Sequence, residues 1–547
     1  MIKFINRFVE FRYAHLVCFA LLTILWMPMA FLGFHPHHEG LMLATLNLTS
    51  EAIKTGNSLP FNQYGHFWVL PYLTMDLLPL GGFTFLAQRI VSIFMILVSA
   101  ILVRQISLIF YSRKTSLVLS CLFLSTYPYG QPSIIWPSVP AQLALLVLTY
   151  SIIKSSYSLD RLQIFLASIA TVFLFGSRVQ IGVLSLICTT VILVLTRRYA
   201  FLSQYFFYVF LLFGFVTFVF QRLGLLDDVL FDSFVFPLTY LDPSQQNWTF
   251  PRTSLVLAVA LVLLYFAITL MKQTESSMRY VLFTLFALLT GIIGIQTLDQ
   301  ALFLKIYART FVAVFLVILV GVLLSLIRDL KLTGAEVLPR KILYLYTLVG
   351  GIQIFPLFDV WHAWYASATL IIATPLVLKR TEFYSRLSTK FSSLLANLFV
   401  LVFVSIFGLQ AVQSVSSEVK PFPLEEVRGL FLSTQQALDF EREFEFFTSS
   451  IPRNAKVLNV CGNADPFFLR NYYSTGNRFF VFWPGIEEVL SLEESLDDVD
   501  YVTSCTSLEG VNKESQRLLE REFTEIQTND DVISWGIQWT IYKRNVG

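Results

Sequence analysis

Charged residues are scarce in this chain of 547 residues: Asp, Glu, Lys and Arg make up 14% of it, against about 25% in soluble domains. Such a composition excludes an ordinary soluble enzyme. The chain contains no glycine-rich phosphate loop and no dinucleotide fingerprint, so nothing indicates a nucleotide as a substrate. The net charge is only +2, and we expect no nucleic-acid partner.

Cysteine is also rare, and the five present are too dispersed for a disulfide scaffold. Cys18, Cys121 and Cys188 lie within apolar runs, where cysteine acts as a small packing residue. Cys461 and Cys505 lie in the more polar C-terminal part, where a disulfide is chemically allowed outside the cell. The sequence leaves open whether these two form a bridge.

Hydrophobic residues, in contrast, make up 55% of the chain and are concentrated in runs. A helix of about 20 apolar residues crosses roughly 30 Å of hydrocarbon. We therefore expect a polytopic α-helical membrane protein with about 13 transmembrane helices. The expected spans are residues 13–33, 83–110, 115–127, 139–153, 162–175, 179–196, 205–223, 254–271, 280–295, 310–327, 342–354, 362–378 and 392–412.

Basic residues occur in every second loop between these runs. Because basic loops remain in the cytoplasm, this alternation places the N-terminus inside, and the first loop and the C-terminal tail outside. We thus expect a multi-pass protein of the cell membrane with an extracytoplasmic C-terminal domain. The residues concerned are Lys3, Arg7, Arg12, Arg113, Lys114, Lys154, Arg161, Arg197, Arg198, Lys272, Arg279, Arg328, Lys331, Arg340, Lys341, Lys379 and Arg380.

One apolar stretch, residues 67–82, does not fit this count. It contains Pro71, Asp76 and Pro79, and it is short. We expect it to be re-entrant or interfacial, since a full span here would reverse the sidedness of every later basic loop.

The composition becomes polar after residue 415. We expect a transmembrane domain at 1–415, a linker at 416–423 and a small α/β domain at 424–547. Helices are predicted at 431–447 and 516–523, and strands at 456–461, 479–482, 501–503 and 538–542.

The first exterior loop, residues 34–82, carries the most reactive motif. His35-Pro36-His37-His38-Glu39-Gly40 precedes a predicted amphipathic helix at 40–55, which Gly56 ends. We expect this helix to lie flat on the membrane, with Glu39 ionised at its N-terminus. Such a carboxylate suits the removal of a proton from an acceptor that attacks a lipid-linked sugar. The alternative is a capping acid without chemistry.

The second half of this loop reads Pro60-Phe61-Asn62-Gln63-Tyr64-Gly65-His66-Phe67-Trp68 and mixes turn residues, amides and aromatic rings. Aromatic residues suit both sugar faces and the membrane interface. This segment is therefore either part of a sugar site or an aromatic belt.

The His-His-Glu-Gly motif after the first span, followed by Asn-Gln-Tyr-Gly, resembles the GT-C superfamily of polyprenyl-phosphate-sugar glycosyltransferases. The resemblance implies that Glu39 is the catalytic base, and it extends to the plan of a dozen spans with an exterior α/β domain. We expect His37, His38, Gln63 and Tyr64 to bind substrate. The chain departs from the common pattern in having Glu in place of Asp, and His66 where Pro often follows Tyr-Gly.

A lipid-phosphate donor requires cations near the exterior face. Arg178 is the first candidate for a phosphate clamp, the alternative being a snorkelling residue. Arg309, next to Lys305 in a predicted exterior loop, either binds substrate or pairs with Asp299. We expect Arg89, at the start of the second span, to snorkel outward.

Two acidic clusters are also expected on the exterior side. Asp359 and His362 are three residues apart and share one helix face. Their pattern resembles an Asp-x-x-His motif of bacterial GT-C-like proteins. They either bind substrate or form an interfacial anchor. Asp227, Asp228 and Asp232 form either a second acidic site or a solvated loop surface. The sequence requires no cofactor and leaves a divalent metal open, and we assign no metal ligands.

These patterns favour an enzyme that moves a sugar from a polyprenyl-phosphate carrier to a glycan, lipid or protein acceptor. A flippase for lipid-linked saccharides is the alternative, although it requires charges at the bilayer midplane. A non-enzymatic assembly factor is the third interpretation, and it would tolerate Glu39→Gln.

Overall fold

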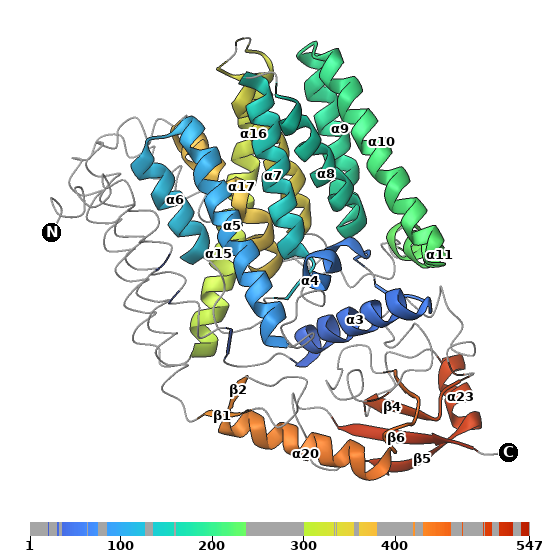
Figure 1. Ribbon diagram of the computed structural model, residues 1–547. Coiled ribbons are helices and arrows are strands. Elements are labelled where there is room, and N and C mark those ends of the chain that lie inside the picture. Colours follow the sequence, from blue (N-terminus) through green and yellow to red (C-terminus); the bar gives the residue numbers. More distant parts are fainter. Residues whose placement is uncertain are drawn as a thin grey trace.

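The computed structural model describes residues 36–62, 64–74, 85–125, 135–157, 160–236, 300–332, 336–354, 360–379, 419–421, 430–460, 498–505, 513–528 and 538–545, with a few single positions besides. A helical bundle lies at one side of the molecule, and a small mixed sheet with two helices lies beyond one end of it (Figure 1).

The bundle is built from the apolar runs. Among the residues that the structure describes, four helices are long and apolar enough to cross a membrane: α5 (Phe85–Phe110), α7 (Ser138–Tyr157), α10 (Tyr199–Arg222) and the Phe311–Leu330 part of α15 (Gln300–Leu330). Further helices pack among them, namely α6 (Arg113–Ser125), α8 (Arg161–Ser177), α9 (Val179–Leu195), α16 (Leu338–Gly351) and α17 (Val360–Lys379). The total of about 13 spans remains a prediction, because the expected spans at 13–33, 254–271, 280–295 and 392–412 lie outside the residues that the structure describes.

The basic loops gather at one end of the bundle. The turns that join α5 to α6, α9 to α10 and α15 to α16 lie at the upper end in Figure 1, whereas the C-terminal sheet lies beyond the lower end. Each of these turns carries basic residues, so the alternation predicted from the sequence holds across these turns.

Specific contacts at the basic end close the helices. Asp160 caps α8 by accepting a hydrogen bond from the Leu162 amide at 2.9 Å. The Arg198 guanidinium donates to the carbonyl oxygens of Ser155 and Ser156, near the C-terminus of α7, where a cation also complements the helix dipole.

The predicted interfacial helix is α3 (Pro36–Thr55), which begins four residues earlier than expected and ends before Gly56. Gly56 adopts a positive φ of 74°, and its amide donates to the Ala52 carbonyl at 2.8 Å, which closes the helix. Figure 1 shows α3 lying across the lower end of the bundle, between it and the C-terminal sheet. Residues 41–46 are all buried, so the first half of this helix is enclosed on several faces, whereas Glu51, Lys54 and Thr55 in its last turns are exposed.

The first half of the stretch at 67–82, which we predicted to be re-entrant or interfacial, does not form a spanning helix. It forms a single turn, η1 (Phe67–Val69), and a short helix, α4 (Leu70–Leu73), which has Pro71 in its first turn. Asp76 and Pro79 lie outside the described residues.

The C-terminal part contains a four-stranded sheet in the order β3-β4-β6-β5, made of β3 (Val457–Asn459), β4 (Tyr501–Cys505), β5 (Phe523–Thr528) and β6 (Trp539–Arg544). β3 and β4 are parallel, and the other two pairings are antiparallel. Two helices accompany the sheet, α20 (Thr434–Ser450) and α23 (Lys513–Glu522). A capping box between Ser433 and Gln436 starts α20.

Three details of this domain differ from the prediction. Residues 419–421, within the predicted linker, form strand β1 (Val419–Pro421), which pairs with β2 (Phe431–Ser433). Strand β2 occupies the first residues of the helix that we expected at 431–447. Strand β5 was not predicted. The expected strand at 479–482 lies outside the described residues, as do the side chains of Cys461 and Cys505, so the disulfide remains open.

Candidate functional site: the end of the bundle beneath the first loop

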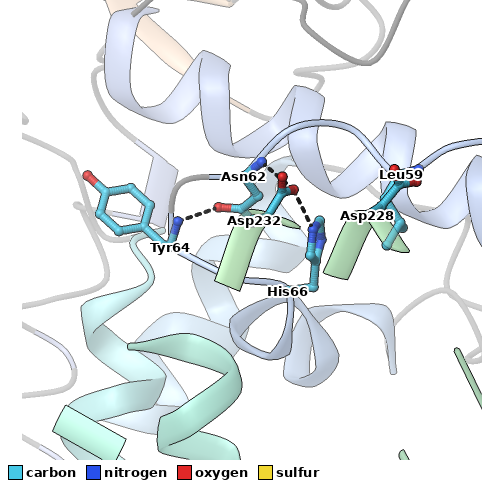
Figure 2. A network of polar contacts seen from close by, with 6 residues as sticks. All are labelled: Leu59, Asn62, Tyr64, His66, Asp228 and Asp232. Carbon is cyan, nitrogen blue, oxygen red and sulfur yellow. Dashed lines mark hydrogen bonds and ion pairs between the residues drawn. The ribbon is translucent and has the colours of Figure 1, made fainter. Parts of the chain in front are cut away.

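Two carboxylates hold the loop that follows α3 in place (Figure 2). Asp232 Oδ2 accepts hydrogen bonds from the Asn62 amide at 3.0 Å and from His66 Nε2 at 2.8 Å. Asp228 Oδ2 accepts from the Leu59 amide at 2.8 Å. These acids come from α11 (Leu226–Leu230) and the π-helical turn η2 (Phe231–Val235). Asp232 is completely buried, so the interpretation of this residue as part of a solvated loop surface is wrong.

The loop then passes directly over the end of α8. Gly65 has a φ of +80°, and a Cβ there would lie 2.3 Å from the Gly176 carbonyl oxygen. A Cβ on Gly176 would in turn lie 2.1 Å from the Phe67 ring. Two glycines are thus required for the loop backbone and the helix end to approach this closely. The approach places Tyr64 beside the turn that joins α8 to α9.

That turn consists of Arg178, which ends α8 and precedes α9. The Arg178 guanidinium lies over the Tyr64 ring at 4.4 Å from its centroid, and its Nη2 donates to Ser138 Oγ at 2.5 Å. The Tyr64 ring packs edge-on against Trp136, with 5.5 Å between centroids. A cation is therefore held by an aromatic face and one hydroxyl group at the end of the bundle.

Two buried donors at this position have no partner among the residues that the structure describes. Arg178 Nε and Ser177 Oγ are both buried and make no hydrogen bond. No carboxylate among the described residues forms an ion pair with Arg178. Burial lowers the pKa of the Arg178 guanidinium in this turn, and the nearby Tyr64 and Tyr365 phenols oppose the shift. Arginine retains its charge in proteins, and a buried guanidinium without a counter-ion in the described part of the chain has the arrangement of an anion site.

The start of α17 forms another side of this region. Gln142, one turn beyond Ser138 on α7, donates through Nε2 to the carbonyl oxygens of Trp364 at 3.1 Å and Tyr365 at 2.8 Å. Its Oε1 is buried without a partner. His362, predicted to bind substrate, is buried one turn before these residues.

Glu39 lies at the first turn of α3 and is completely buried, as is Arg89 on α5. Arg89 Nη2 donates to Glu39 Oε2 at 2.7 Å, and Arg89 Nε donates to Oε1 at 3.2 Å. Arg89 also donates to the Ala30 carbonyl and lies 4.6 Å from the centroid of the Phe85 ring. The prediction that Arg89 snorkels outward is wrong, because Glu39 holds it inside the fold.

The remaining predicted site residues divide into two groups. The backbones of His37 and His38 belong to α3, but their side chains lie outside the described residues, and so do Gln63, Asp359 and Asp299. Arg309 and Lys305 belong to α15, which begins at Gln300, so they are helical and do not lie in a loop as we expected. The structure brings Tyr64 and Arg178 together and adds Ser138 and Ser177, which the sequence analysis did not identify.

Acidic and histidine side chains do not converge on a metal site here. Among the residues that the structure describes, no group of three or more His, Cys, Asp or Glu side chains is placed to hold an ion. His66 and Asp232 are two such groups, and two ligands do not define a metal centre.

The chain resembles solved oligosaccharyltransferases. It superposes on the archaeal oligosaccharyltransferase AglB of Archaeoglobus fulgidus in complex with an inhibitory peptide and a dolichol-phosphate, with a TM-score of 0.47 and 12% identity, over 97% of this chain and 74% of that chain. A crystal structure of the A. fulgidus oligosaccharyltransferase tethered to an acceptor peptide gives a TM-score of 0.48 and 12% identity, over 96% and 74% of the two chains. The apo form gives a TM-score of 0.47 and 13% identity, over 96% of this chain and 74% of that chain.

No protein-family model and no curated protein sequence matches the chain. With TM-scores below 0.5, the likeness carries no conclusion about activity, which therefore depends on the site.

Proposed function

We propose that the protein is an integral-membrane glycosyltransferase that takes a sugar from a polyprenyl-phosphate carrier and passes it to an acceptor at the exterior face. The observation that carries this proposal is Arg178, a guanidinium at the end of the bundle with one hydroxyl partner and a buried, unpartnered Nε. A phosphate is the anion that a guanidinium fork binds best, and a lipid phosphate lies at this depth in a membrane.

The reaction requires a positive charge beside the leaving group. When the bond between the sugar and the phosphate breaks, negative charge develops on the phosphate oxygen. Arg178, with the Ser177 hydroxyl beside it, is positioned to stabilise this charge where little water competes. Tyr64 covers the guanidinium and limits its movement, so the cation needs little reorganisation when the charge develops.

The reaction also requires a base for the acceptor. We retain Glu39 in this role, as the GT-C resemblance implies. Arg89 donates one hydrogen bond to each of its oxygens, and the second lone pair of either oxygen is the one that would accept a proton from the acceptor. His66 is a second group of suitable chemistry, since Asp232 binds its Nε2 while its buried Nδ1 has no partner.

A transfer assay in liposomes tests this proposal and separates the two bases. The full-length protein is supplied with labelled polyprenyl-phosphate sugars and, in parallel, with nucleotide sugars. We expect transfer from the lipid donors only, and a loss of about 10²–10⁴-fold in rate for Glu39→Gln. His66→Gln serves as the matched comparison, because it removes the other base and retains a polar side chain.

Three outcomes contradict parts of this account. Full turnover by Glu39→Gln together with loss in His66→Gln would move the role of base to His66. Movement of the intact lipid-linked saccharide across the bilayer without cleavage would support the flippase. An absence of both transfer and transport with every donor would favour the assembly factor.

A further inference from the structure

Side chains from the membrane domain complete the core of the C-terminal domain. Phe61 of the first loop and Phe236, directly after η2, are 5% and 2% exposed and meet edge-on with 4.7 Å between ring centroids. They share one buried cluster with residues of the sheet and its helix, namely Leu458, Val460, Leu496, Val499, Val502, Leu519 and Phe523. The first loop is thus packed into a domain more than 390 residues away in sequence.

The same two segments also meet through hydrogen bonds. The backbone amide of Asn62, next to Phe61, donates a hydrogen bond to Asp232, which precedes Phe236 by one turn. An apolar contact and a polar contact therefore fix the loop at neighbouring points. A change in the position of Phe61 must alter the Asn62–Asp232 bond.

The path from Phe61 to the anion site is short. The Asn62 side chain accepts a hydrogen bond from the Tyr64 amide at 3.1 Å (Figure 2). The Tyr64 ring lies on the Arg178 guanidinium. Only two residues separate Phe61, which is buried in the C-terminal domain, from Tyr64, which covers the cation.

We propose that Phe61 is a positioning residue through which the C-terminal domain sets the affinity of the Arg178 site for phosphate. This inference rests on the proposed function. When the C-terminal core encloses Phe61, Tyr64 is held over Arg178 and the site is ready for the donor. A shift of the C-terminal domain, such as acceptor binding would cause, is transmitted to the donor site along this segment.

Binding of a polyprenyl monophosphate without a sugar tests the inference in the full-length protein in lipid nanodiscs. We expect Phe61→Ala to bind this probe about tenfold more weakly, a typical size for coupling between sites. Phe61→Leu retains most of the buried volume and should lie between Phe61→Ala and the wild type. The maximal transfer rate at saturating donor should change less than the donor KM in both variants.

Phe447→Ala is the matched control. Phe447 is a fully buried ring of the same domain that packs on Trp539 and belongs to a different cluster from Phe61. We expect it to bind the probe within twofold of the wild type. An equal loss in Phe447→Ala would mean that general destabilisation causes the effect, and it would overturn the inference.

A further comparison separates this inference from the proposed function. Wild-type affinity in Phe61→Ala and Phe61→Leu, together with loss in Arg178→Gln, would overturn the role of Phe61 and leave the phosphate site intact. Wild-type affinity in Arg178→Gln would overturn both.

Discussion

Replacing Arg89 by methionine will lower the free energy of unfolding by about 3–5 kcal/mol, the usual cost of removing one partner of a buried ion pair. Glu39 would lose the guanidinium that donates to both of its oxygens at a completely buried position. The loss also releases the start of α3 from α5. Thermal or denaturant unfolding of the purified protein in detergent measures the change.

The reciprocal variants show whether the pair itself is responsible. Glu39→Met removes the carboxylate from Arg89 and should lower the free energy of unfolding by a similar amount. Glu39→Met combined with Arg89→Met should recover much of this loss. Lys456→Met is the control, because its partner Asp498 is largely exposed and such pairs contribute about 0–1 kcal/mol. A double variant that is as unstable as the sum of the single ones would mean that the pair is not coupled.

Replacing Arg178 by glutamine will lower kcat/KM for a lipid-phosphate sugar by about 10²–10³-fold, as does the loss of one group that stabilises transition-state charge. Glutamine retains a hydrogen-bond donor for Ser138 but has no charge to meet the departing phosphate. Arg178→Lys keeps the charge and loses the planar fork, so we expect an intermediate loss. Steady-state transfer kinetics in liposomes provide both values.

Arg113→Gln is the control for this experiment. Arg113 is exposed at the start of α6, at the opposite, basic end of the bundle. It should have little effect on kcat/KM. If both arginine variants lost activity equally, the effect would come from overall charge and the phosphate assignment to Arg178 would be wrong.

The sequence predicted the features that depend on local pattern. Apolar runs marked α5, α7 and α10, and the spacing of apolar residues after Gly40 marked α3, which ends before Gly56 as expected. The basic loops predicted which helix ends lie together. In the C-terminal domain, alternating or continuous apolar residues marked β3, β4 and β6.

Contacts between distant segments were not predictable in the same way. Glu39 and Arg89 are 50 residues apart, and His66 and Asp232 are 166 apart, so no periodicity links them. Asp232 looked like a loop residue because it follows Asp227 and Asp228 in a segment, residues 224–252, that lies between two long apolar runs. Its burial follows from the π-helical turn and from the loop that packs on it.

Strand β5 was missed for a different reason. Only Phe523 in this strand is buried, and the polar residues after it show no alternation that would indicate a half-buried strand. Strand β1 was missed because two prolines near it are typical of a linker. It pairs along one edge only, where Pro421 is tolerated.

The most direct test of the account is whether Arg178 recognises a lipid phosphate. Titration of the wild type with a polyprenyl monophosphate and with the uncharged polyprenol of equal length isolates the contribution of the phosphate. We predict that the monophosphate binds at least about tenfold more tightly, a difference of about 1.4 kcal/mol, and that Arg178→Gln abolishes this preference. An unchanged preference in Arg178→Gln would contradict the account.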